Sequence, residues 1–183
     1  MNWRRALGGL LALVIAVAAT ALATQDRPQG DPVKETFATS SLQLSAGSNG
    51  AADSEAKLRW RTLSWSSEGM KRMRQDAAIR ADLNQRFQVA MQTELTLPVA
   101  VMLDSRRLPA DTYRFWLTMN DAGSFELLFL LDHEQVRVPI DLSETKHNFP
   151  YLQFALVPTD EAYFALVFQW GTELGRVLFT KAS

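Results

Sequence analysis

The chain contains no cysteine and only two histidines, His133 and His147. The lack of cysteine excludes disulfides, thiolate metal sites and cysteine nucleophiles, so the core alone must hold the fold together. Neither a Gly-x-Ser-x-Gly elbow nor a glycine-rich phosphate loop is present, so the usual signatures of a serine hydrolase and of a nucleotide-binding protein are missing. Positive charge is not in excess either. The chain has 19 Lys and Arg and 20 Asp and Glu, and this net charge of −1 gives no electrostatic reason to bind nucleic acid.

The first 23 residues are the most informative about location. Two arginines precede an apolar run from Ala6 to Leu22, and Ala21-Leu22-Ala23 places small residues at the two positions that a signal peptidase reads. This layout predicts a secretory signal peptide over residues 1–23, and therefore a periplasmic or secreted protein. The alternative is an uncleaved anchor, for which the run is slightly shorter than the roughly 20 residues that span a bilayer. We expect membrane attachment only in that second case.

Composition divides the rest of the chain into a tether and one domain. Residues 24–56 are rich in Gly, Ser, Ala, Asp and Pro and carry few large apolar side chains. Such a segment buries too little surface to offset its ordering entropy, so it is predicted to be a disordered tether, with at most a short strand around Ser41–Leu44. Residues 57–183 are predicted to form a single β-rich domain.

One helix is predicted near the start of this domain, over about residues 67–88. Ser66 or Ser67 is a suitable N-cap, and an acidic residue follows in the first turn. Ile79, Leu83 and Phe87 recur at intervals of four, which places them on one face of the helix. We expect that face to pack on a sheet while the arginines of the segment face solvent.

From Thr93 onward the polarity alternates with a period of two residues. Short apolar runs are separated by turn sequences such as Asn120-Asp121-Ala122-Gly123, and the helical period does not return after Gln88. The sequence therefore predicts a mainly β fold, an antiparallel β-sandwich or partly closed barrel with one N-terminal amphipathic helix packed on it.

The stretch from Leu97 to Leu142 resembles a family of exported bacterial β-sandwich domains of unknown function. The family has a Leu-Pro-Ala-Gly-Thr-Tyr run between an apolar and an aromatic-rich strand, and the matching residues here are Leu108, Pro109, Ala110, Thr112 and Tyr113. Asp111 stands where the family has Gly, and Asp tolerates a left-handed backbone better than most residues. The resemblance implies an exported β-sandwich, and it implies no particular reaction.

Candidates for catalytic chemistry are few. His133 lies in a tight polar turn whose side chains diverge, which is a poor arrangement for metal ligands. His147 would share a face with Glu144 only if the polar loop from Ser143 to Asn148 turned helically, and two ligands do not complete a site. Acids such as Asp104, Glu126 and Asp141 would suit glycoside hydrolysis if the fold brought two of them together. From these residues we predict no metal and no cofactor.

The aromatic residues offer a better candidate. Trp116 alternates with Arg114 and Thr118 on one face of a predicted strand, so it is a candidate for an exposed platform that stacks on a sugar ring or anchors a protein. The alternative places Trp116 beneath the helix. With Trp116 and Arg114 as the binding residues, the sequence favours a non-catalytic exported module that binds a protein partner or an envelope glycan. An envelope hydrolase that uses carboxylates or a Glu/His metal centre is the alternative function.

Overall fold

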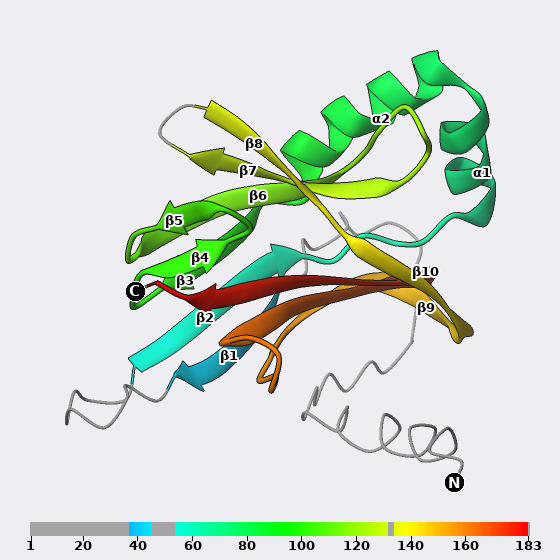
Figure 1. The fold of residues 1–183 in the computed structure, drawn as a ribbon. Coiled ribbons are helices and arrows are strands. Elements are labelled where there is room, and N and C mark those ends of the chain that lie inside the picture. The colour runs from blue at the N-terminus through cyan, green and yellow to red at the C-terminus, as the bar shows by residue number, and fades with distance from the viewer. Residues whose placement is uncertain (1–36, 45–53, 132–133, 183) are drawn as a thin grey trace, which may run out of the picture. The chain divides into compact units, whose positions relative to one another are not determined.

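The structure, a computed structural model, describes residues 37–44, 54–131 and 134–182. Within them the chain is mainly β, as predicted, with ten strands in two antiparallel sheets and two helices (Figure 1). The sheets do not form a closed barrel. The predicted signal peptide lies outside the described residues. None of the described helices is both long enough and apolar enough to cross a membrane.

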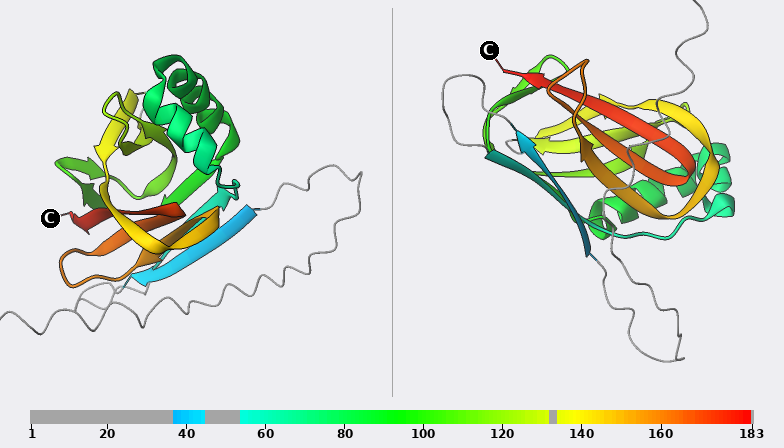
Figure 2. Two further views of the ribbon diagram at one scale, coloured as in Figure 1. Left: turned by 90° about the vertical axis from the view of Figure 1, so that its right-hand side faces the viewer. Right: turned by 90° about the horizontal axis from the view of Figure 1, so that it is seen from below.

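Each sheet mixes strands that are distant in sequence. The six-stranded sheet has the order β1-β2-β3-β6-β7-β8, with bounds β1 (Phe37–Leu44), β2 (Ser54–Arg61), β3 (Thr93–Leu97), β6 (Asp111–Met119), β7 (Phe125–Leu131) and β8 (Glu134–Pro139). The four-stranded sheet has the order β5-β4-β10-β9, with bounds β5 (Arg106–Leu108), β4 (Val101–Leu103), β10 (Phe164–Lys181) and β9 (Asp141–Val157). Figure 2 shows both helices on the same side of this assembly.

The prediction of a disordered tether over residues 24–56 is wrong for the residues that form β1 and the start of β2. These strands pair without interruption from Phe37↔Arg61 to Leu44↔Ser54, so β1 is longer than the short strand that the sequence suggested. The parts of the tether at 24–36 and 45–53 lie outside the described residues. An edge strand needs only one apolar face, and the three side chains Ala38, Leu42 and Leu44 pack on the core. Its remaining stabilisation comes from the backbone ladder, which composition does not reveal.

The single predicted helix is two helices, α1 (Ser67–Gln75) and α2 (Ala77–Ala90). Ser66 caps the first, as predicted, by accepting a hydrogen bond from the Gly69 N–H. Asp76 ends α1 in an extended conformation, and its carboxylate accepts from the backbone N–H groups at the start of α2. Asp competes with helical hydrogen bonding through its own side chain, so it breaks the continuous helix that the apolar spacing predicted.

Helix α2 lies beside β6 where β3 no longer pairs with it (Figure 1). The β3–β6 ladder stops at Thr93↔Phe115. Beyond that point the Asn84 side chain takes over, since its amide donates to the Met119 carbonyl and accepts from the Met119 N–H, both at 2.9 Å. The helix therefore satisfies backbone groups that a strand would otherwise pair.

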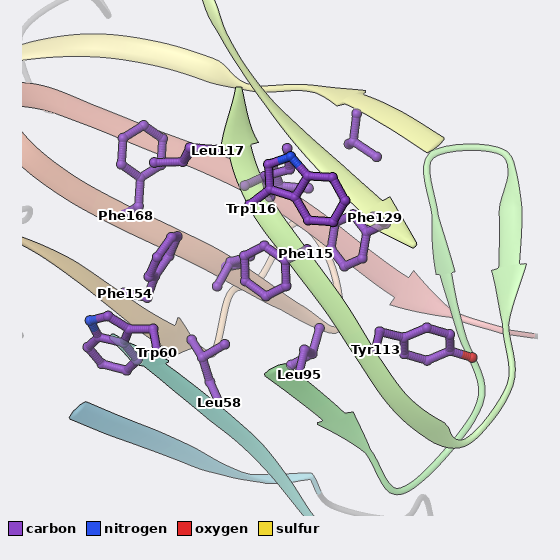
Figure 3. Packing of buried hydrophobic residues seen from close by; sticks show 14 of the residues in the cluster. Leu58, Trp60, Leu95, Tyr113, Phe115, Trp116, Leu117, Phe129, Phe154 and Phe168 are labelled. Carbon is purple, nitrogen blue, oxygen red and sulfur yellow. The ribbon is translucent and has the colours of Figure 1, made fainter. Parts of the chain in front are cut away.

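Aromatic rings join the two sheets in the core. Phe115 of β6 stacks on Phe129 with centroids 4.9 Å apart and meets Phe154 of β9 edge-on at 5.6 Å (Figure 3). Trp60 also packs edge-on against Phe154, and its indole N–H donates to the Leu152 carbonyl at 3.1 Å. These contacts fix the spacing between the sheets, because each ring belongs to a strand buried on that face.

The run that carries the family resemblance passes from one sheet to the other. Leu108 ends β5, Asp111 begins β6, and the Tyr113 hydroxyl donates to the Pro109 carbonyl at 2.8 Å. Asp111 does not have the positive φ that a Gly at this place would suggest. Its carboxylate instead accepts from the Thr112 N–H, which is local hydrogen bonding typical of Asp in turns.

Candidate functional site

Trp116 is not an exposed platform. Its side chain is 7% exposed, Leu128 opposite it on β7 is also buried, and so is Thr118 on the same face. The alternation with Arg114 suggested solvent on this face of β6. However, α2 packs against the far half of the strand, as the hydrogen bond from the Met119 N–H to the Asn84 side chain shows. The exposed-platform hypothesis is therefore wrong, and Trp116 belongs to the core.

Arg114 does lie in a candidate site. It is exposed and lines a surface hollow of about 430 Å³, which we call the arginine hollow; its other lining residues are Arg59, Gln88, Val89, Gln92 and Glu94. Three of the six residues come from neighbouring strands β2, β3 and β6 of one sheet. The others come from the end of α2 and the turn after it.

Strand register brings the charged residues of the hollow together. Arg59 pairs with Glu94 across β2 and β3, and Glu94 pairs with Arg114 across β3 and β6. The result is a row on one face of the sheet in which Glu94 lies between Arg59 and Arg114. Arg59 Nη1 lies 3.7 Å from Glu94 Oε2, and both side chains are about half exposed. An exposed pair of this kind contributes only about 0.2–1 kcal/mol, so a ligand can displace it easily.

Arg59 also contacts an aromatic ring of β1, the strand on the other side of β2 from β3. Its guanidinium lies 3.8 Å from the centroid of the Phe37 ring, which comes from the edge strand β1. A cation over an aromatic face is attracted by the ring quadrupole, and Arg keeps the edges of its planar fork available for hydrogen bonds in this arrangement. The Phe37 ring thus restrains the position of the Arg59 guanidinium in the hollow.

Gln92 follows α2 with a φ of 44°, in the left-handed conformation that usually ends a helix with Gly or Asn. A non-glycine residue there costs roughly 1–2 kcal/mol. Strained positions of this kind often occur at ligand sites, and Gln92 lines the hollow. The strain is therefore consistent with a binding role.

Gln92→Gly is expected to leave the fold intact and to raise its free energy of unfolding by up to about 1 kcal/mol, because glycine adopts a positive φ without steric cost. Urea denaturation monitored by tryptophan fluorescence measures the change. Gln88→Gly is the matched control within α2, and it should lower stability by roughly 1 kcal/mol, since glycine is a poor helix former. A loss of stability in both variants would show that Gln92 is not strained.

Two of the three acids that the sequence offered for hydrolysis form ion pairs with different arginines. Glu126 pairs with Arg137 at 3.2 Å, and Asp141 pairs with Arg176 at 3.4 Å. Asp104 lies in the β4–β5 turn, where it helps to line a second hollow of about 320 Å³ beside β8.

The Glu144/His147 centre has no support from the local structure. The loop expected from Ser143 to Asn148 is part of β9, so no helical turn brings the two exposed side chains onto one face. The β9–β10 register shifts across this stretch. Among the described residues, no group of three His, Asp or Glu side chains lies close enough to hold a metal ion. His133 lies outside the described residues.

Most of the arginine hollow could not be found from sequence. Outward-facing positions were visible in the period-two alternation of β2 and β3, but their pairing was not, and Arg59, Glu94 and Arg114 are far apart in the chain. Comparisons with known proteins give no further guide to the site. The chain matches no protein-family model, and no curated protein or solved structure is similar enough to it to count as a match.

Proposed function

We propose that the chain is an exported, non-catalytic binding module, that its two packed sheets form a β-sandwich, and that the arginine hollow is its binding site. The N-terminal sequence pattern supports action in the periplasm or outside the cell. The observation that carries the binding role is the row Arg59–Glu94–Arg114, which places two guanidinium groups in one surface hollow. Arginine forks recognise ligand oxygens bidentately, so such a pair suits recognition.

The lining of the hollow favours binding over catalysis. Its six described residues are two arginines, two glutamines, one glutamate and one valine. Hydrolysis of a glycosidic bond uses a pair of carboxyl groups, whereas this hollow has a single one. Elsewhere, Glu126 and Asp141 are each engaged by an arginine on a different part of the fold. These observations support the non-catalytic module over the hydrolase that the sequence also suggested.

Thermal denaturation of the purified chain tests this proposal. The panel holds acidic and neutral envelope glycans, peptides, and divalent metals with EDTA as control. A ligand at about 100 times its Kd adds about 2.7 kcal/mol to the folded state, which raises Tm by roughly 5–10 °C in a domain of this size.

We expect a ligand of the panel to raise the Tm of the wild type but not the Tm of Arg114→Gln. The matched control is Arg107→Gln, since Arg107 is exposed on β5 of the other sheet. A rise with a metal that EDTA reverses would instead favour the hydrolase. A rise that survives in Arg114→Gln would place the binding site elsewhere and contradict our assignment of the hollow.

A further inference from the structure

We infer that the arginine hollow takes a saccharide unit that bears an anionic group, with Arg59 and Arg114 on either side of the anion. This inference rests on the proposed function and names its ligand class. The anionic group is a carboxylate or a phosphate, since both present oxygens that an arginine fork can bind.

Charge on the outer face of the six-stranded sheet favours an anion. The hollow itself has two arginines against one glutamate. Lys57 and Arg61 flank Arg59 at the neighbouring outward positions of β2, and Lys57 is paired with Glu55 on the same strand at 3.2 Å. The chain as a whole has a net charge of −1, so the lining of the hollow differs in sign from the protein average. A locally basic surface attracts an anionic ligand and raises its rate of association.

The spacing of the two arginines suits a single anion that displaces the Glu94 carboxylate. Arg59 and Arg114 lie on strands separated only by β3, so their Cα atoms are about 10 Å apart, twice the spacing of neighbouring strands. Glu94 occupies the position between them. Its distance of 3.7 Å from Arg59 is longer than the roughly 2.7–2.9 Å of a direct charge-assisted hydrogen bond. A ligand anion can therefore replace the Glu94 carboxylate as the closer partner.

The remaining groups favour a sugar over a peptide or a protein surface. The hollow is built on β2, β3 and β6, which are internal strands, so their backbone groups are already paired and cannot accept an added peptide strand. Among the described residues that line it, only Val89, 71% exposed, is apolar, whereas protein interfaces are centred on buried aromatic anchors. The amides of Gln88 and Gln92 each donate and accept hydrogen bonds, as sugar hydroxyls also do.

Isothermal titration calorimetry of the purified full chain tests the inference with matched saccharides. The ligands are an oligogalacturonate, a neutral galactose oligomer of the same length, and galactose 1-phosphate. We expect at least one acidic saccharide to bind about tenfold or more tightly than the neutral oligomer, because a hydrogen bond to a charged group adds at least one factor of ten. Which acidic ligand binds distinguishes a carboxylate from a phosphate. The affinity should also fall as salt rises, since the hollow is open to solvent.

Two variants should change the affinity in opposite directions. Arg114→Gln is expected to weaken binding of the acidic saccharide about tenfold. Glu94→Gln should strengthen it severalfold, because it removes the competing carboxylate and keeps the size of the side chain. Arg107→Gln is the control and should leave the affinity unchanged. Far-ultraviolet circular dichroism and Tm check that each variant is folded. A general loss of packing could not raise affinity in one variant and lower it in another.

The possible failures can be told apart. Equal binding of the neutral and acidic oligomers, with no effect of Glu94→Gln, would overturn the anionic ligand and leave the binding module standing. Binding of acetate or inorganic phosphate as tight as that of the acidic saccharide would overturn the sugar. A peptide that binds in an Arg114-dependent manner while both acidic saccharides do not would overturn the saccharide class. If no ligand of any kind acts through Arg114, the proposed function falls as well.

Discussion

Gly171→Ala is expected to lower the free energy of unfolding by about 2–5 kcal/mol. Gly171 lies in β10 with a φ of 62°, where an L-residue costs roughly 1–2 kcal/mol. In addition, a Cβ on this residue would overlap the indole ring of Trp65. Forcing extra volume into a packed site costs roughly a further 1–3 kcal/mol, and the two costs add because backbone and side chain are strained at once.

The Trp65 ring has little freedom to move away from a methyl group at Gly171. It packs edge-on against Trp170, with ring centroids 5.5 Å apart, and Trp170 in turn contacts Phe87 and Phe125. The Trp65 backbone N–H donates to the Pro150 carbonyl at 2.7 Å, which fixes the chain beneath the ring. Relief of the overlap would therefore disturb the aromatic packing between α2 and β10.

Urea denaturation measures the effect, with Gly123→Ala as the matched control. Gly123 has a similar φ of 78°, but a Cβ there would make only an ordinary van der Waals contact with Arg74, 3.4 Å from its Cγ. The control should therefore show the backbone cost of about 1–2 kcal/mol alone. If Gly171→Ala loses no more stability than the control, the Trp65 ring moves freely, contrary to the packing described above.

The sequence predicted those elements whose pattern is local. Alternation with a period of two located β3, β4, β6, β7 and β8, since each has an apolar face that must be buried. It missed the first part of β9, where a polar loop was expected from Ser143 to Asn148. The length of β1 was underestimated because the stability of this strand depends on its pairing with β2 rather than on its own composition. The division of the helix at Asp76 was missed because the apolar spacing continues through the break, and only the side-chain hydrogen bonds reveal it.

The candidate site depends on long-range register, which the sequence could not provide. Arg114 was identified because it lies next to Trp116 on a predicted strand, yet the structure separates the two, with Trp116 in the core and Arg114 at the surface. Arg59 and Glu94 become its neighbours only through two consecutive strand pairings. A shift of one residue in either pairing would move Glu94 to the opposite face and remove the row of charges.

Trp116→Ala is expected to lower the free energy of unfolding by about 3–5 kcal/mol, the usual cost of truncating a buried aromatic residue. The side chain is 7% exposed and belongs to the same buried cluster as Leu128, its cross-strand partner. Since the indole is not at the surface, its loss should not remove a ligand contact. Chemical denaturation gives the stability, and calorimetry on the folded variant gives the affinity for whichever ligand binds the wild type.

The comparison that decides between packing and binding uses Tyr151→Ala as control. Tyr151 is an aromatic residue 49% exposed on β9, so its truncation should cost less than about 1 kcal/mol. If Trp116 is a core residue, Trp116→Ala loses several times more stability than the control and, where it remains folded, binds ligand with the affinity of the wild type. A variant of near-normal stability that no longer binds ligand would contradict its burial and restore Trp116 as a contact residue. Arg114 lies two positions away on the same strand but is exposed in the arginine hollow. Its substitution should therefore give the reverse result, with binding lost and stability kept.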